Sequence, residues 1–297
     1  MLHVHNFSYG ILTPGVGYLM SCMGAFLGLR CTARARPFQG ATRARWLLLA
    51  GVSIGTTGIW VMHFIAMLGF TIPRETIRYN VPITILSMVI AVVVVGIGIF
   101  IVGFRDGTGP LVLGGVIIGC GVASMHYIGM SAIRVQDSLS FNPLLVAASV
   151  IIAVIAGTAA LWAALRLDTL WSAVIASLIM GIAVSGMHYT GMAALRVYPA
   201  PGVTVNTSAT ASALAFLLPL ILGLSMVGLI FSTVIALSPT AAEILEEGEL
   251  MARIAGTSQG EPPPRAASPA ASTDPGAAQP GSLFRPHPSQ QQQQRRL

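Results

Sequence analysis

The sequence predicts an all-α membrane protein, a bundle of seven transmembrane helices built from three two-helix repeats plus a seventh helix. Three observations predict this fold. Long apolar runs alternate with short polar breaks up to about Leu237, only four acidic residues precede Glu243, and one short phrase around a histidine occurs three times within the apolar runs. Because lipid satisfies no backbone hydrogen bonds, segments that cross a bilayer are expected to be helical.

Seven apolar runs are long enough to span the bilayer. A hydrocarbon core of about 30 Å requires about 20 helical residues. We expect spans at residues 8–29, 46–70, 82–103, 110–133, 143–165, 170–195 and 211–237. The first six pair into the repeats, and the seventh is expected to close or connect the bundle.

Arginine sets the expected orientation. The break after the first span carries five arginines, at positions 30, 34, 36, 43 and 45. Short loops rich in arginine or lysine face the cytoplasm. We therefore expect a multi-pass protein of the plasma membrane, in contact with the lipid bilayer, with its N-terminus outside and its C-terminus inside. The net charge of +6 then reports topology, and no nucleic-acid partner is expected.

Composition also separates the tail from the bundle. We expect residues 238–255 to form a short cytoplasmic helical extension. Residues 256–297 are rich in Pro, Ala, Ser and Gln, with too little apolar surface to order themselves, and are expected to be a disordered low-complexity cytoplasmic tail. No second globular domain is expected there, so any soluble output belongs to a separate protein.

The repeated phrase is the main clue to function. Its three copies are Met62-His63-Phe64-Ile65-Ala66-Met67, Met125-His126-Tyr127-Ile128-Gly129-Met130 and Met187-His188-Tyr189-Thr190-Gly191-Met192. The histidines are 63 and 62 residues apart, which indicates an internal repeat. Each lies seven residues before the expected outer end of its helix, or about 10 Å along the axis. The three imidazoles should therefore share one depth, toward the outer leaflet.

These side chains indicate a metal site. Ionisable groups within membrane spans are costly and usually face the bundle interior. We expect His63, His126 and His188 to bind a metal together with the methionines four residues later, which share their helix face: Met67, Met130 and Met192. The methionines that precede each histidine, Met62, Met125 and Met187, are weaker candidates. Imidazole and thioether without carboxylate favour a soft metal, above all copper.

At these residues the chain resembles the bacterial MHYT-domain integral membrane proteins, named for a Met-His-Tyr-Thr phrase. Residues 187–190 match the phrase literally, whereas the first copy keeps only Met-His. The resemblance covers residues 7–237 and implies a signalling sensor domain in the bacterial inner membrane, with copper near the outer face and O2, CO or NO as the sensed gas. Family members often carry cyclic-di-GMP or kinase domains after the last helix, so we expect a separate cytoplasmic signalling partner here.

Two tyrosines and three alternatives complete the expectations. Tyr127 and Tyr189 could bind a metal-bound diatomic molecule or orient an imidazole, whereas Phe64 cannot. No enzyme motif is apparent, and we expect no catalytic activity. The same ligands would serve a transporter or delivery protein for copper or another metal, although the inner half of the spans has few polar residues. A haem held by two of the histidines is the third alternative.

Overall fold

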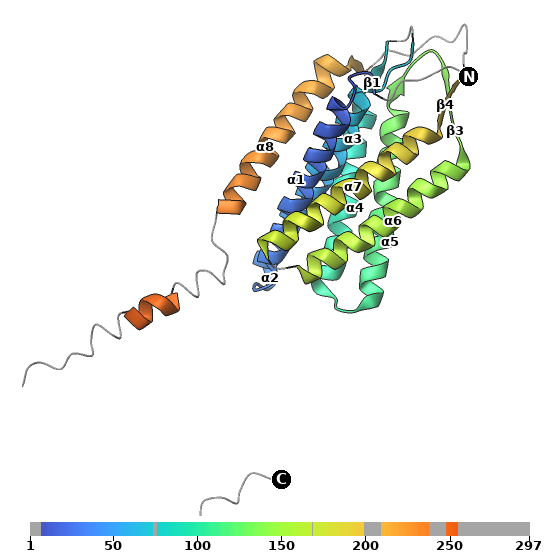
Figure 1. The fold of residues 1–297 in the computed structure, drawn as a ribbon. Helices are drawn as coiled ribbons and strands as arrows, with labels where there is room; N and C mark the ends of the chain where they lie inside the picture. The colour runs from blue at the N-terminus through green and yellow to red at the C-terminus, as the bar shows by residue number, and fades with distance from the viewer. Residues whose placement is uncertain (1–6, 74–75, 168, 199–208, 238–247, 255–297) are drawn as a thin grey trace, which may run out of the picture. The chain divides into compact units, whose positions relative to one another are not determined.

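The computed structural model describes residues 7–73, 76–167, 169–198, 209–237 and 248–254. Seven helical spans long and apolar enough to cross a membrane are present, as the hydropathy pattern predicts. Their elements are α1 (Leu12–Ala35), α2 (Gly40–Ser53), η1 (Ile54–Val61), α3 (Met62–Leu68), α4 (Val81–Phe104), α5 (Thr108–Ser131), α6 (Pro143–Arg166), α7 (Leu170–Ala194), η2 (Ala213–Leu217) and α8 (Leu218–Leu237). α2, η1 and α3 form one continuous span, and η2 leads into α8 (Figure 1).

Several expected boundaries shift, and the largest shift is at the first arginines. The first span was expected to end at residue 29, but α1 continues to Ala35 and carries Arg30 and Arg34. The helix tolerates them because Arg30 is buried and Arg34 donates from Nη2 to the carbonyl oxygen of Ile235 in α8, 2.9 Å away. A guanidinium at the end of a span can thus close helix packing as well as set orientation.

Two asparagines start equivalent helices in successive repeats. Asn80 caps α4 by accepting from the backbone N–H of Ile83, and Asn142 caps α6 by accepting from Leu144 and Leu145. A proline follows within the first turn of each helix, where its missing N–H leaves no intrahelical bond unmade. The two caps are 62 residues apart, the same period as the second pair of histidines.

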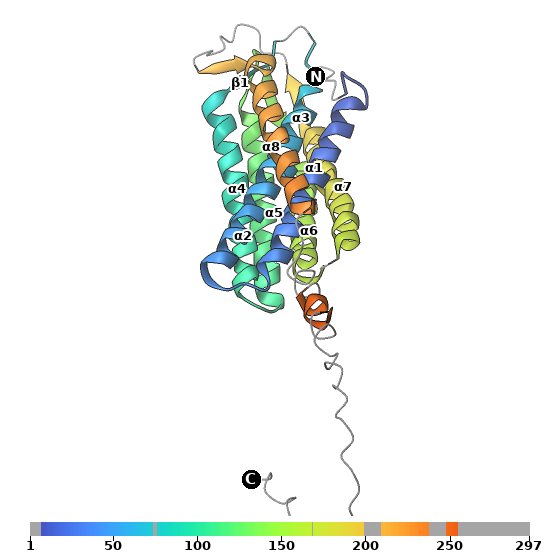
Figure 2. The same ribbon diagram turned by 90° about the vertical axis from the view of Figure 1, so that its left-hand side faces the viewer.

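Five short strands lie at one end of the bundle, which we call the strand end; the opposite end, near Arg30 to Arg45, is the arginine end. The strands are β1 (Arg78–Asn80), β2 (Ile133–Arg134), β3 (Ser138–Phe141), β4 (Leu195–Tyr198) and β5 (Thr210–Ser212). β1 pairs antiparallel with both β2 and β5, and β3 pairs antiparallel with β4. Figure 2 shows β1 across the end of the bundle above α4. The strands follow the histidine-bearing helices directly and tie the ends of different repeats together.

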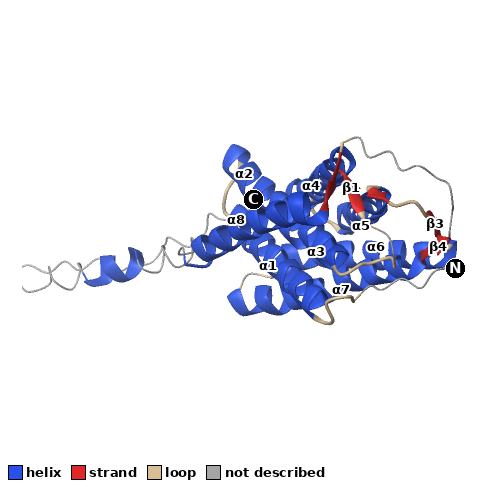
Figure 3. Cartoon of the chain, turned by 90° about the horizontal axis from the view of Figure 1, so that it is seen from above, coloured by secondary structure: helices blue, strands red, loops and turns tan. Residues whose placement is uncertain are grey.

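Close helix contacts place the second span at the middle of the bundle. Gly24 of α1 lies against the backbone of Gly58, and Gly55 faces the backbone of Val92 in α4, where a β-carbon would come within 2.8 Å of Val92 Cα. Small residues permit this approach. Every residue of α3 from Met62 to Met67 is consequently buried, and α3 lies near the centre in the view from above (Figure 3).

The expected tail domains fall mostly outside the description. Residues 248–254 are helical, within the predicted extension at 238–255. Residues 238–247 and 255–297 lie outside the described residues, and so does the disordered tail expected from residue 256.

Candidate metal centre

The three repeated histidines meet inside the bundle. His63 comes from α3, His126 from α5 and His188 from α7, and each is at most 1% exposed. Nδ1 of His63 lies 3.0 Å from Nδ1 of His188 and 3.1 Å from Nδ1 of His126. The ring centroids are 4.9, 5.0 and 5.1 Å apart. The shared depth predicted from spacing therefore brings three nitrogens to one point.

Glycines from the following repeat hold two of these rings. A β-carbon at Gly129 would lie 2.7 Å from Nε2 of His63, and one at Gly191 would clash with Nε2 of His126. Both glycines stand three residues after the histidine of their own helix. Among the described residues, Nε2 of His63 and of His126 has no hydrogen-bond partner. Steric contact with glycine backbone thus orients these rings, in place of the hydrogen bond that usually orients a ligating imidazole.

The geometry of the nitrogens fits a small metal ion. Metal–imidazole bonds of about 2.0–2.1 Å place three nitrogens of a trigonal site about 3.5 Å apart, so each ring would withdraw by only about 0.3 Å. With Nδ1 as the donor atom, the proton of each neutral imidazole resides on Nε2. The described residues place no carboxylate or cysteine in this group of potential ligands. Imidazole nitrogens alone suit copper, zinc, iron or nickel and are poor ligands for calcium or magnesium.

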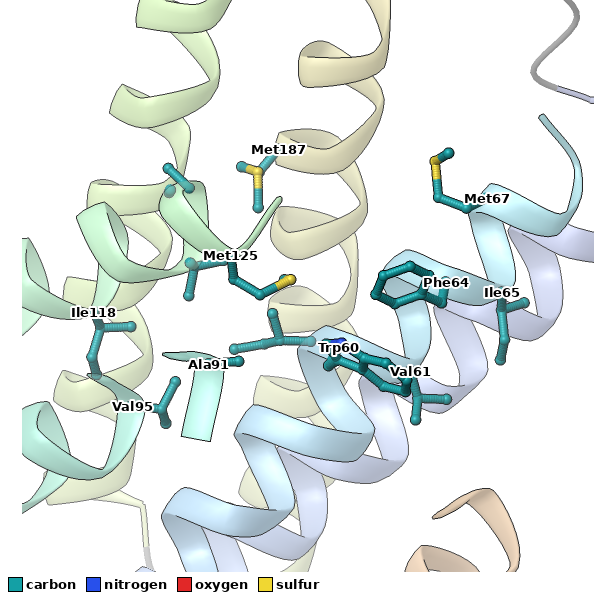
Figure 4. Packing of buried hydrophobic residues seen from close by; sticks show 14 of the residues in the cluster. Trp60, Val61, Phe64, Ile65, Met67, Ala91, Val95, Ile118, Met125 and Met187 are labelled. Atoms are coloured by element: carbon teal, nitrogen blue, oxygen red, sulfur yellow. The ribbon is translucent and has the colours of Figure 1, made fainter. Parts of the chain in front are cut away.

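All six flanking methionines are buried, but they lie in different surroundings. Met67, Met130 and Met192 are one helical turn beyond the histidines toward the strand end. Met62 packs against Gly17 of α1, whose β-carbon would lie 3.6 Å from Met62 Cγ. Figure 4 shows Met125 and Met187 close together, with Met67 on the other side of Phe64. The structure thus separates the six predicted thioethers into distinct groups.

The tyrosines of the phrase stack beside their own histidines. The rings of Tyr127 and Tyr189 are each 4.9 Å from the adjacent imidazole. The hydroxyl of Tyr127 is 2.7 Å from Ser149 Oγ of α6, and the ring of Tyr189 lies 5.4 Å from that of Phe7. The hydroxyl of Tyr127 therefore connects α5 to α6.

In the first repeat, Trp60 makes the contact that Phe64 cannot. Its Nε1–H donates to Ser87 Oγ of α4 at 3.0 Å. Ser87 follows the cap Asn80 by seven residues, as Ser149 follows Asn142, so the two serines are equivalent in the repeat. Sequence analysis missed Trp60, although its position three residues before His63 and the repeated Asn-to-Ser spacing were both visible signals.

Aromatic side chains close the site toward the strand end. Tyr79 of β1 is 1% exposed and stacks edge-on to Phe64 at 6.1 Å, and Phe64 lies 4.6 Å from Trp60. Burial raises the pKa of Tyr79, so its phenol stays neutral. The histidines are therefore separated from this end of the molecule by a packed aromatic layer.

One family's sequence profile matches the chain three times, at residues 57–115, 119–177 and 181–245, which is more than half of its length. The profile is MHYT, described as "Bacterial signalling protein N terminal repeat". The chain belongs to the MHYT family. Each match begins six or seven residues before a histidine of the cluster. In this phase a repeat comprises the histidine-bearing half-helix, a strand and the next span, so α8 falls within the third MHYT repeat and α1 precedes the first.

Curated relatives carry the same region within longer proteins. The chain is 34% identical over 195 residues to the bifunctional diguanylate cyclase/cyclic di-GMP phosphodiesterase MucR of Pseudomonas aeruginosa, covering 64% of this chain and 28% of MucR. It is 34% identical over 218 residues to the cyclic di-GMP phosphodiesterase NbdA of the same organism, covering 71% and 28%. For the signaling protein YkoW of Bacillus subtilis the identity is 32% over 186 residues, covering 59% and 23%. The match thus spans about a quarter of each relative, and no solved structure matches the chain.

Proposed function

We propose that this MHYT protein is a membrane sensor that binds copper through Nδ1 of His63, His126 and His188. The observation that carries the proposal is the convergence of the three nitrogens at 3.0–3.1 Å in a site that holds no opposing charge. A bound cation would accept all three lone pairs. Without it, each Nδ1 must face another nitrogen that has at most one proton to share.

Copper is favoured over other imidazole-binding metals by the buried sulfur nearby. Met67, Met130 and Met192 lie one turn from the ring plane, and thioethers select Cu(I). When bound, copper supplies an open coordination position for O2, CO or NO and a one-electron redox couple. The protein's own side chains would hold the ion, exclude water and present Tyr127 and Tyr189 beside the imidazoles.

The signal would leave through α8. The η1 segment that leads into His63 touches α8, where a β-carbon at Gly228 would lie 3.0 Å from Thr57 Oγ1. Arg34 also bonds to α8 through the carbonyl oxygen of Ile235. A change at His63 therefore has a direct mechanical connection to the last span. We place the strand end outside a bacterial inner membrane and the arginine end in the cytoplasm, where a separate signalling protein would receive the output.

The alternative functions have less support. Transport requires a polar path to the arginine end, yet Ser53, Thr56 and Thr57 line a cavity against α8, and the space directly beyond the histidines is apolar. A haem ring would have to lie between two of the imidazoles. Imidazoles whose nitrogens are 3.0 Å apart leave no room for it.

Copper content tests the proposal directly. Protein purified without chelator should contain about one copper ion per chain, and its absorption spectrum should lack the bands of haem. Replacement of each histidine by alanine should lower Cu(I) affinity at least about tenfold, or 1.4 kcal/mol. Thr190→Ala is the matched control, because this hydroxyl only donates to the Gly186 carbonyl oxygen within α7. Wild-type copper content in all three folded histidine variants would leave these residues a structural role only.

A further inference from the structure

An apolar cavity lies directly beyond the three histidines toward the arginine end. Its volume is about 50 Å³, and residues from five spans line it. Three of them, Ile59, Val122 and Val184, each stand four residues before one of the clustered histidines. A spacing of four residues is about one helical turn, so the cavity lies roughly 5–6 Å below the imidazoles on the shared axis of the three helices. We call this cavity the axial chamber.

The wall of the axial chamber determines what it can hold. Isoleucine, valine, alanine, leucine, glycine and methionine line it, and none of these side chains offers a hydroxyl, an amide or a charge. Roughly 10–15 Å³ is enough for one water molecule, but water enters only where polar groups can bind it. An apolar chamber of this size instead favours an uncharged, apolar molecule of a few atoms.

The position of the axial chamber indicates how such a molecule would arrive. Every lining residue belongs to a membrane-spanning segment, and Ala156, Ala160 and Val184 are only half-buried. The packed layer of Phe64 and Tyr79 closes the opposite side of the histidines. Figure 4 shows Val95 and Ile118 on the arginine-end side of Met125 and Met187. Met187, which lines the chamber, directly precedes His188.

We propose that the axial chamber is a binding site for a small uncharged apolar molecule that enters from the hydrocarbon region and reaches the histidines from the arginine-end side. Occupancy of the chamber depends only on its apolar wall. Contact between its occupant and a metal rests on the proposed copper site. The chamber would exclude anions and strongly hydrated molecules, because its wall cannot replace their hydration.

Xenon is a suitable probe, since it is uncharged, apolar and unreactive. In nanodisc-embedded protein with 13C-labelled methionine methyl groups, xenon should shift the Met187 resonance with a saturable dependence on pressure. Met226 on α8 is 59% exposed and serves as the internal control, with only the linear shift that xenon in lipid produces. Sodium azide should leave Met187 unchanged. A saturable azide shift at Met187, or a xenon response no different from that of Met226, would overturn the proposal.

Variants locate the binding site and separate it from the metal. Ala156→Leu fills the axial chamber and should abolish the saturable shift, whereas Ala159→Leu, on the exposed face of the same helix, should not. Val184→Ile is a milder filling variant that should weaken xenon binding if Ala156→Leu does not fold. His126→Ala should retain the xenon response even if copper is lost, so failure of the copper proposal and failure of this one give different results. Full xenon binding in a folded Ala156→Leu protein would contradict the assignment.

Discussion

Gly129 of α5 lies against the imidazole of His63, and a β-carbon at this glycine would come within 2.7 Å of Nε2. The contact joins two repeats: the residue three positions after one histidine seats the histidine of the repeat before it. Gly191 seats His126 in the same way. The position of each of these rings therefore depends on a neighbouring helix as well as on its own.

Gly129→Ala should displace His63 from the cluster. Overpacking costs about 1–3 kcal/mol, and loss of a group that orients a metal ligand typically lowers affinity by about 10–100-fold. We expect a loss of that size in Cu(I) affinity, measured by competition with a chromogenic chelator. Gly186→Ala is the control, because nothing lies within 4 Å of its added methyl group. Equal affinities for the two variants would show that this glycine contact does not position His63.

Tyr127→Phe should reduce stability and leave the metal in place. The hydroxyl bonds to Ser149 across the α5–α6 contact, and such a bond contributes about 0.5–1.5 kcal/mol. We expect a lower thermal midpoint in detergent with unchanged copper affinity. Tyr198→Phe, at a side chain 40% exposed, is the control. A changed response to O2, CO or NO at unaltered stability would instead assign the hydroxyl to the sensed ligand.

Met192→Leu tests whether a thioether binds copper. The substitution nearly conserves volume, so packing alone predicts little effect. If sulfur is a ligand, Cu(I) affinity should fall by about tenfold or more, while Zn²⁺, which does not favour thioethers, should bind as before. Met226→Leu on the exposed face of α8 provides the comparison. Unchanged Cu(I) affinity would assign Met192 to packing.

A reporter fused after Leu237 should be cytoplasmic. Reversing the charges of the arginines between residues 30 and 45 should disturb insertion more than replacing Arg134 or Arg196, because short arginine-rich loops dominate orientation. Fusions to alkaline phosphatase and to a fluorescent protein measure the two sides of the membrane. Phosphatase activity together with an absence of fluorescence would reverse the orientation proposed here.

The spans and the histidine cluster were predictable because both follow local periodic patterns. Apolar runs mark the helices, and the repeat places His63, His126 and His188 at one depth. The seating of His63 by Gly129 was not predictable, since it depends on rotation of one helix against another. The strands were also missed: β1 has three residues, and its partners β2 and β5 are remote in sequence. Such short segments carry no alternating pattern of their own.

The contact of Trp60 with Ser87 illustrates the same limit. Its repeat equivalent uses Tyr127, so the interaction is retained while the residue that makes it moves by one helical turn. Comparing the phrases position by position suggests that the first repeat has lost its polar group. In space, the indole of Trp60 occupies that role.

The π-helical turns of η1, from Ile54 to Val61, give the second span a reserve of backbone length. A π turn takes in more residues than an α turn for nearly the same advance along the axis. Removing one residue from this segment would let it relax to an α-helix and would turn all that follows by about 100° relative to what precedes it. His63 would then leave the meeting point of the three nitrogens while the rest of the span stayed in place. The η1 segment thus sets the azimuth of His63 independently of its depth.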